Sequence, residues 1–147
     1  MFRQVTDKFY AAPQIDVGAV TEAKRLGIVA IVNNRPDDED EGQIAGSEIE
    51  QAAREAGISY TAIPVTHAGF SEAQVDALIE ALDGAQGPVL SFCRSGTRST
   101  LLWALARAKQ GHDPEEIAAD AASAGYDIAP VRQLVDMLAA RSNSTES

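Results

Sequence analysis

The apolar run IVAIV at residues 28–32 is the feature that most constrains the fold of this chain. Its β-branched residues do not alternate with polar ones, which is typical of a strand covered on both faces. Further strands are expected at 9–12, 58–65 and 88–92, with helical segments between them. This alternation with short links predicts βαβ crossovers. We therefore expect an α/β fold with a central, mostly parallel sheet of four to five strands flanked by helices.

Short polar motifs mark the boundaries of the helices. Asp16 is a candidate N-cap, and Gly27 is a candidate terminating residue. Ser-x-x-Glu/Gln capping boxes begin at Ser47 and Ser71, and Pro114 fits the first position of a later helix. Helices are expected at 16–26, 47–56, 71–82, 98–110, 114–124 and 130–141. We predict a single domain over residues 1–141 and a disordered polar tail at 142–147.

Composition excludes several functional classes. The net charge of −10 argues against nucleic-acid binding, so any anion site must be local. No stretch approaches the ~20 apolar residues of a membrane helix, and the N-terminus lacks the apolar segment of a signal peptide. The single cysteine cannot form an internal disulfide, which favours the cytoplasm. CxxC and HExxH motifs are absent, so we expect no metal site and no cofactor.

The single cysteine, Cys93, lies in the string CRSGTRS at residues 93–99. The string follows a predicted strand and precedes a predicted helix. Backbone N–H groups at a helix N-terminus favour negative charge, and such a field lowers the pKa of a thiol. Cys93 is therefore the candidate nucleophile, and Arg98 is the candidate clamp for a tetrahedral or planar anion. The rest of the candidate anion-binding loop is Arg94, Ser95, Gly96, Thr97 and Ser99.

The loop resembles the signatures of two enzyme classes. Cysteine phosphatases have Cys, five residues and Arg, whereas rhodanese sulfurtransferases have Cys, four residues and often Arg. More broadly, the chain is similar to the phosphatase-like domain of the bacterial beta-lactamase hydrolase-like family. The segments that carry this resemblance are FYAAPQ at 9–14, IVNNRPD at 31–37, IPVT at 63–66, CRSGTRS and AGYD at 124–127. The resemblance implies a dual-specificity-phosphatase-like fold. It also implies, as a possible functional partner, a metallo-beta-lactamase-type domain associated with persulfide oxidation.

The spacing within the loop leaves the reaction open. Four residues separate Cys93 from Arg98, one fewer than in the phosphatase pattern. A shorter ring cradles a smaller object, so loop length favours transfer of a sulfane sulfur, while the resemblance over the whole chain favours phosphate-ester hydrolysis. We expect a cysteine phosphatase that acts on a small anionic substrate. The alternatives are a sulfurtransferase that carries a cysteine persulfide and a non-catalytic anion-binding module.

The general acid that a phosphatase of this type needs is not obvious. The resemblance places an Asp about 30 residues before the cysteine. In this chain, the corresponding segment VTHAGF at residues 65–70 contains no Asp. His67 is the positional candidate at the end of a predicted strand. Asp37 and Asp38 are the other candidates, because their loop should open on the same side of the sheet as Cys93. Arg35 either adds positive charge to the site or pairs with the acidic run at 37–41.

Overall fold

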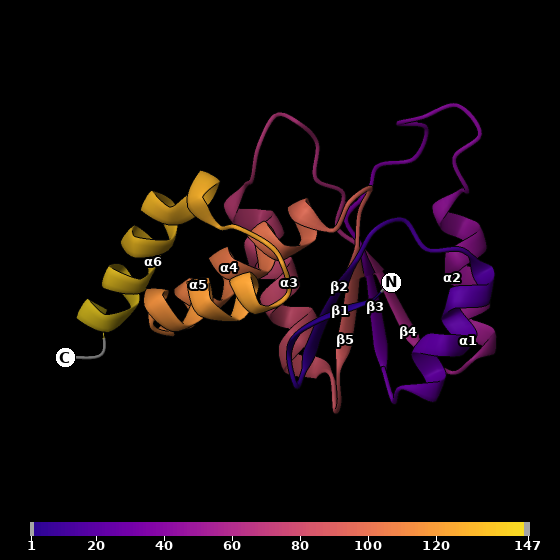
Figure 1. Ribbon diagram of the computed structural model, residues 1–147, viewed down its shortest axis with the longest axis horizontal. Coiled ribbons are helices and arrows are strands. Elements are labelled where there is room, and N and C mark those ends of the chain that lie inside the picture. The colour runs from indigo at the N-terminus through magenta and orange to yellow at the C-terminus, as the bar shows by residue number, and fades with distance from the viewer. Residues whose placement is uncertain (1, 146–147) are drawn as a thin grey trace.

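The computed structural model describes residues 2–145 and builds them around one five-stranded sheet (Figure 1). The strands are β1 (Arg3–Thr6), β2 (Phe9–Ala12), β3 (Ala30–Asn33), β4 (Ser59–Ala62) and β5 (Val89–Phe92). Their order is β1-β2-β5-β3-β4, and only β1 runs antiparallel to its neighbour. The predicted α/β fold is confirmed. The edge strand β1 escaped prediction because its sequence, RQVT, is mostly polar and exposed.

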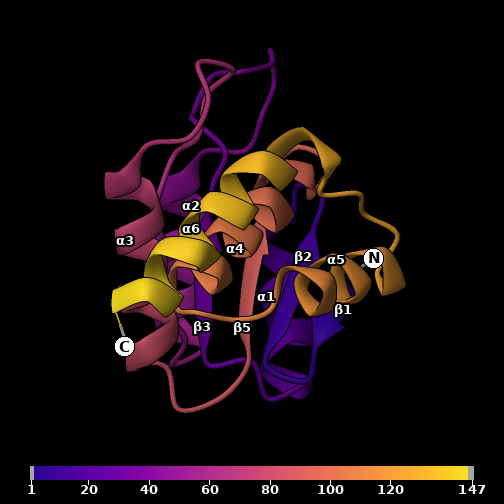
Figure 2. The same cartoon turned by 90° about the vertical axis from the view of Figure 1, so that its left-hand side faces the viewer.

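Helices cover both faces of the sheet (Figures 1 and 2). One face carries α1 (Val17–Arg25) and α2 (Gly46–Glu55). The other carries α3 (Glu72–Gly84) and α4 (Thr97–Lys109), and α6 (Arg132–Thr145) packs outside α4. The helix α5 (Pro114–Ser123) contacts α4 and β1, and a short 3₁₀ helix, η1 (Ala129–Val131), leads into α6.

Local capping signals explain some helix starts. The Asp16 carboxylate accepts the N–H of Ala19 at 2.9 Å, as expected of an N-cap. At α3, Ser71 and Gln74 exchange the two hydrogen bonds of a capping box. These two predictions are confirmed, and Gly27 follows α1 with φ of 82°.

The capping box predicted at Ser47 is wrong, because α2 begins one residue earlier. Its N-cap is Ala45, which has no side-chain acceptor. The N–H of Gly46 is instead satisfied by the carboxylate of Asp37 at 2.8 Å, from the preceding loop. Glu48 accepts the N–H of Ala45 at 3.4 Å. A contact between segments nine residues apart therefore sets the start of this helix.

The C-terminal helix extends beyond the domain boundary expected from the sequence. Because α6 continues to Thr145, residues 142–145 of the predicted tail are helical. Residues 146–147 lie outside the described residues. Among residues 2–145, no helix is long and apolar enough to cross a membrane.

The core depends most on α4, which is covered by the sheet and by α3, α5 and α6. Leu102, Ala104 and Leu105 are fully buried. Trp103 is 2% exposed and stacks on Phe9 of β2, with ring centroids 5.5 Å apart. A second apolar cluster lies between the sheet and the α1–α2 layer. Since α4 starts at the end of the cysteine loop, this packing fixes one side of that loop.

Truncation of Leu102 should measure how much the fold depends on α4. Leu102→Ala leaves a cavity in a closely packed region, so we expect the free energy of unfolding to fall by about 2–5 kcal/mol. Urea unfolding followed by circular dichroism measures the change. Met137→Ala is the control, because Met137 is 48% exposed and its truncation should cost less than about 1 kcal/mol. Equal losses in the two variants would contradict this account of the core.

Candidate active site

Cys93 lies at the carboxyl end of β5, in the turn that leads into α4. Gly96 is the N-cap of α4 and has φ of 91°, a left-handed conformation that glycine adopts without steric cost. This turn directs the N–H of Gly96 at the sulfur of Cys93, with an N–Sγ distance of 3.0 Å. The loop is also tied to the end of β2, where Ala12 accepts the N–H of Cys93 at 3.3 Å. The thiol is fully buried in this arrangement.

Arg98, in the first turn of α4, faces both Cys93 and the loop after β3. Its Nη1 and Nη2 donate to the two oxygens of Glu39 at 2.6 and 2.9 Å, and Nη1 also donates to the carbonyl of Val65 at 2.7 Å. Hydrogen bonding to Glu39 is the main cause that raises the pKa of Arg98, and the charge of Cys93 adds to it. The structure therefore brings Cys93 and Arg98 together, as the spacing of the loop suggested.

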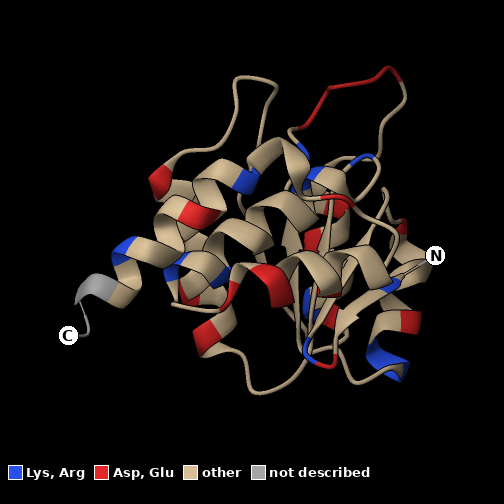
Figure 3. Ribbon diagram, turned by 60° about the vertical axis from the view of Figure 1, so that its left-hand side comes forward, with Lys and Arg blue, Asp and Glu red and all other residues tan. Residues whose placement is uncertain are grey.

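The acidic loop between β3 and α2 supplies the counter-charges of the site. In Figure 3 it appears as a red segment that projects from the molecule. Glu39 accepts from Arg98 and also from Arg35 Nε at 3.0 Å, and these bonds, led by the one from Arg98, lower its pKa to about 2. Asp40 pairs with Arg35 at 2.5 Å and with Arg94 at 3.3 Å. Arg35 therefore pairs with the acidic run and also adds positive charge beside the site.

Arg35 is a buried member of this cluster. Its side chain is 5% exposed, and its Nη1 donates to Gln14 Oε1 at 3.0 Å. Gln14 follows β2, so the cluster joins the segments after β2, β3 and β5. Glu39, Asp40 and Gln14 were not predicted as site residues from the sequence. The acidic run was visible, but nothing in it distinguishes the carboxylate that faces Arg98 from those that face solvent.

The three candidates for the general acid have different surroundings. His67 is exposed in the loop between β4 and α3, and among residues 2–145 its side chain has no hydrogen-bond or ion-pair partner. Asp37 uses one carboxylate oxygen to cap α2. Asp38 has φ of 62° and is exposed. The two loops that carry these three residues project from the same edge of the sheet (Figure 1).

The hydroxyl groups of the loop divide into exposed and buried ones. Ser95 Oγ donates to Thr97 Oγ1 at 3.0 Å on the exposed side. Ser99 Oγ is buried and has no hydrogen-bond partner within the described part of the chain. A buried hydroxyl without a partner is costly, which keeps Ser99 a candidate donor for a bound group.

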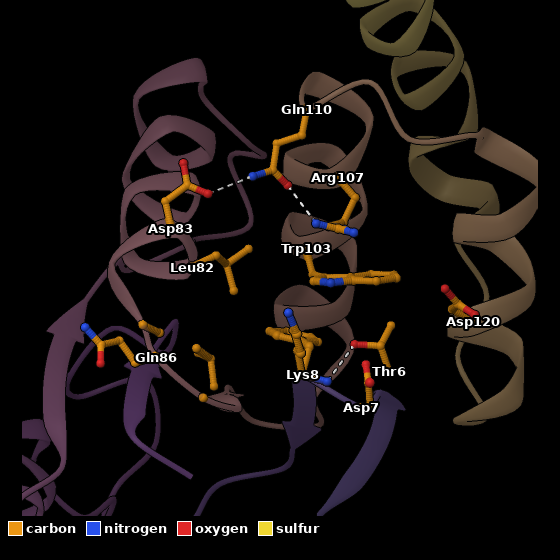
Figure 4. A pocket seen from close by; sticks show the side chains of 14 residues that line it. Thr6, Asp7, Lys8, Leu82, Asp83, Gln86, Trp103, Arg107, Gln110 and Asp120 are labelled. Carbon is orange, nitrogen blue, oxygen red and sulfur yellow. Dashed lines mark hydrogen bonds between the residues drawn. The ribbon is translucent and has the colours of Figure 1, made fainter.

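A cavity of about 900 Å³ lies away from Cys93, beside the amino end of β5 (Figure 4). The turn between β1 and β2, the end of α3 and the C-terminal half of α4 line it. Lys8 and Arg107 contribute positive charge, whereas Asp7, Asp83 and Asp120 contribute negative charge. The cavity is therefore separate from the cysteine loop. A hollow of about 280 Å³ lies beside Arg35, between the loop after β3 and the start of α2.

Comparison with known proteins places this chain and its fold among phosphatase-like proteins. The family model described as "Beta-lactamase hydrolase-like protein, phosphatase-like domain" matches residues 1–110. A curated beta-lactamase hydrolase-like protein from Xylella fastidiosa is 35% identical over 105 residues. The chain belongs to this family. The match covers 71% of this chain but 24% of the relative, so the chain spans about a quarter of the relative's length.

Solved structures show the same fold. A crystal structure from Neisseria meningitidis, of a protein with a provisional phosphatase assignment, has a TM-score of 0.80 and 32% identity. The match covers 92% of this chain and 96% of that one. The catalytic domain of the PP-IP phosphatase SIW14 from S. cerevisiae, in complex with citrate, has a TM-score of 0.68 and 17% identity, with 99% and 91% coverage. The second likeness shows the fold alone.

The ion pair between Glu39 and Arg98 predicts a specific pH dependence of stability. The pKa of Glu39 is about 2 in the folded protein and near 4.5 when unperturbed, so the stabilisation is complete above about pH 4.5 and is lost as the pH falls toward 2. Glu39→Gln should be less stable than the parent protein at pH 7. The difference should shrink below pH 4.5, as measured by urea unfolding at a series of pH values.

Glu41→Gln is the matched control, because Glu41 belongs to the same acidic run and is exposed. Its unfolding free energy should follow that of the parent protein at every pH. A difference between parent and Glu39→Gln that stays constant from pH 7 to pH 3 would contradict the lowered pKa.

Proposed function

We propose that this protein is a cysteine-dependent phosphatase-like hydrolase that acts on a small anionic substrate through Cys93. The observation that carries the proposal is the position of the Cys93 sulfur, which accepts the N–H of Gly96 at 3.0 Å and faces Arg98. A thiolate is thereby held beside a fixed cation at the start of a helix, where backbone N–H groups favour anions. The phosphatase-like family supports the same interpretation.

The hydrogen bonds of Arg98 leave a defined edge for the substrate. A guanidinium carries five N–H donors. Glu39 and Val65 use both hydrogens of Nη1 and one of Nη2, which leaves Nε–H and the second Nη2 hydrogen. These two N–H groups are parallel and form a fork that fits two oxygens of a phosphoryl group. Glu39 therefore orients Arg98 without using the edge that the substrate needs.

The reaction follows from this arrangement. The thiolate of Cys93 attacks phosphorus, an S–P bond forms, and the P–O bond to the leaving alkoxide or phenoxide breaks. Arg98 and the loop N–H groups stabilise the charge on the phosphoryl oxygens. Water then hydrolyses the cysteinyl phosphate, which releases phosphate and restores the thiolate. Ser99, whose buried hydroxyl has no hydrogen-bond partner among the described residues, is the proposed donor to that leaving thiolate.

His67 is the better candidate for protonation of the leaving group. Its side chain is exposed and unpartnered in the described residues, and its loop projects at the same edge as the Cys93 loop. Asp37 is less suited because it caps α2. We also propose a cytoplasmic location, on the basis of the single cysteine. The resemblance to the family suggests a metallo-beta-lactamase-type persulfide dioxygenase as the functional partner.

Substitutions at Cys93 and Arg98 test the proposal through hydrolysis of p-nitrophenyl phosphate. Cys93→Ser should abolish turnover, and Arg98→Lys should lower kcat/KM by about 10²–10³-fold, because lysine cannot form the fork. Arg25→Lys is the control, since Arg25 lies in an exposed pair on α1. Full activity of Cys93→Ser would overturn the assignment of the nucleophile.

The same protein preparation separates phosphatase from sulfurtransferase activity. The four-residue spacing between Cys93 and Arg98 makes sulfur transfer the rival reaction. Thiosulfate and cyanide are therefore supplied in parallel, and thiocyanate is measured. Release of p-nitrophenol without thiocyanate formation supports the proposal. Formation of thiocyanate without p-nitrophenol would replace it with sulfur transfer, and neither product would favour a binding module.

A further inference from the structure

Tyr126 reaches the Cys93 loop from a distant part of the chain. It lies between α5 and η1, beyond residues 1–110 that match the family model. Its hydroxyl donates to the carbonyl of Ser95 with an O–O distance of 3.4 Å. A Cβ atom added to Gly96 would collide with the same hydroxyl oxygen. The phenol is therefore in direct contact with the part of the loop that turns into α4.

The peptide unit between Ser95 and Gly96 connects this hydroxyl with the sulfur. Its carbonyl accepts from Tyr126, and its N–H donates to Cys93 Sγ at 3.0 Å. The peptide group is planar, with its C=O and N–H pointing in opposite directions. Holding the oxygen therefore fixes the direction of the N–H. In addition, a hydrogen bond to the carbonyl polarises the peptide and strengthens the bond that its N–H donates.

Tyr126 is itself held in place by β1. The guanidinium of Arg3 lies over its ring, 5.5 Å from the ring centroid. Arg3 Nη1 also donates to the carbonyl of Ala124 at 3.0 Å, which anchors the same linker. Burial is the main cause that raises the pKa of Tyr126; the charge of Arg3 opposes this shift, and the charge of Cys93 adds to it. The hydroxyl thus remains protonated, and able to donate, at neutral pH.

We propose that Tyr126 is a positioning residue for the nucleophile, which acts through the Ser95–Gly96 peptide to keep the Gly96 N–H directed at the Cys93 sulfur. The inference rests on the proposed role of Cys93 as nucleophile. Tyr126 does not touch the substrate in this account. It stabilises the thiolate of Cys93 at two stages, before the attack on the substrate and when the cysteinyl phosphate is hydrolysed.

The test compares Tyr126→Phe with the parent protein by alkylation of Cys93 with iodoacetamide across a pH series. Loss of the hydroxyl weakens the Gly96 N–H···S bond, so the midpoint of the alkylation profile should move up by about half a pH unit. Arg98 faces the sulfur, and Glu39 pairs with Arg98. They are unchanged in the variant. Tyr10→Phe is the control, because it removes a hydroxyl from β2, and its profile should match that of the parent.

A second measurement follows the peptide directly. The amide proton resonance of Gly96 in ¹⁵N-labelled protein should shift upfield in Tyr126→Phe, while that of Gly57, at the end of α2, stays in place. Urea unfolding of both variants shows whether the fold is retained. If the phosphatase assay is active, kcat should fall by about threefold in Tyr126→Phe with little change in KM.

The outcomes distinguish this inference from the proposed function. An alkylation profile and Gly96 resonance that are the same in folded Tyr126→Phe and the parent would overturn it. A shifted profile in a protein without phosphatase activity would support the positioning role and reject the proposed reaction. If Tyr126→Phe unfolds, the weaker substitution Arg3→Lys is measured in the same way. It should shift the Gly96 resonance in the same direction by a smaller amount, and no shift would overturn the inference.

Discussion

The ion pair between Arg98 and Glu39, with its two hydrogen bonds, is the interaction on which the geometry of the candidate site depends. It connects the first turn of α4 with the loop between β3 and α2, and it holds Arg98, a cation that faces Cys93. In a chain with a net charge of −10, such a cation is needed locally, because the overall charge does not attract anions. Both side chains are mostly buried, at 15% and 18% exposure, so breaking one partner leaves an uncompensated charge in a poorly solvated place.

The site is assembled from segments that are far apart in the sequence. The loop after β5 supplies the sulfur and its N–H donor, the loop after β3 supplies Glu39, and the linker after α5 supplies Tyr126. The parallel arrangement of β2, β5 and β3 brings the first two of these loops to one edge of the sheet. The packing of α5 and α6 against α4 brings the third. If Tyr126 has its proposed role, the C-terminal segments contribute to the candidate site as well as to the core.

The sequence predicted the fold well where the signal was local. Continuous apolar runs identified β3 and β5, and the capping box at Ser71 correctly marked the start of α3. Prediction failed where contacts between segments decide the structure. The start of α2 depends on Asp37, and β1 is a polar edge strand whose pairing with β2 has no periodic signature.

The same distinction applies to the site. The string CRSGTRS predicted that Cys93 and Arg98 lie together. A short strand–turn–helix connection determines the relative positions of these two residues without contacts from distant segments. Glu39 could not be separated from the four other acids of its run, since its partner lies 59 residues away. Tyr126 could be placed against the loop only once the path of the linker after α5 was known.

Identification of the covalent intermediate tests the central claim most directly. The protein is mixed with p-nitrophenyl phosphate, quenched rapidly in acid and digested, and the peptide that contains Cys93 is weighed by mass spectrometry. The account predicts that this peptide gains a phosphoryl group during turnover and that Cys93→Ser shows no such species. Turnover with an unmodified Cys93 peptide, or with the phosphoryl group on another residue, would contradict the account.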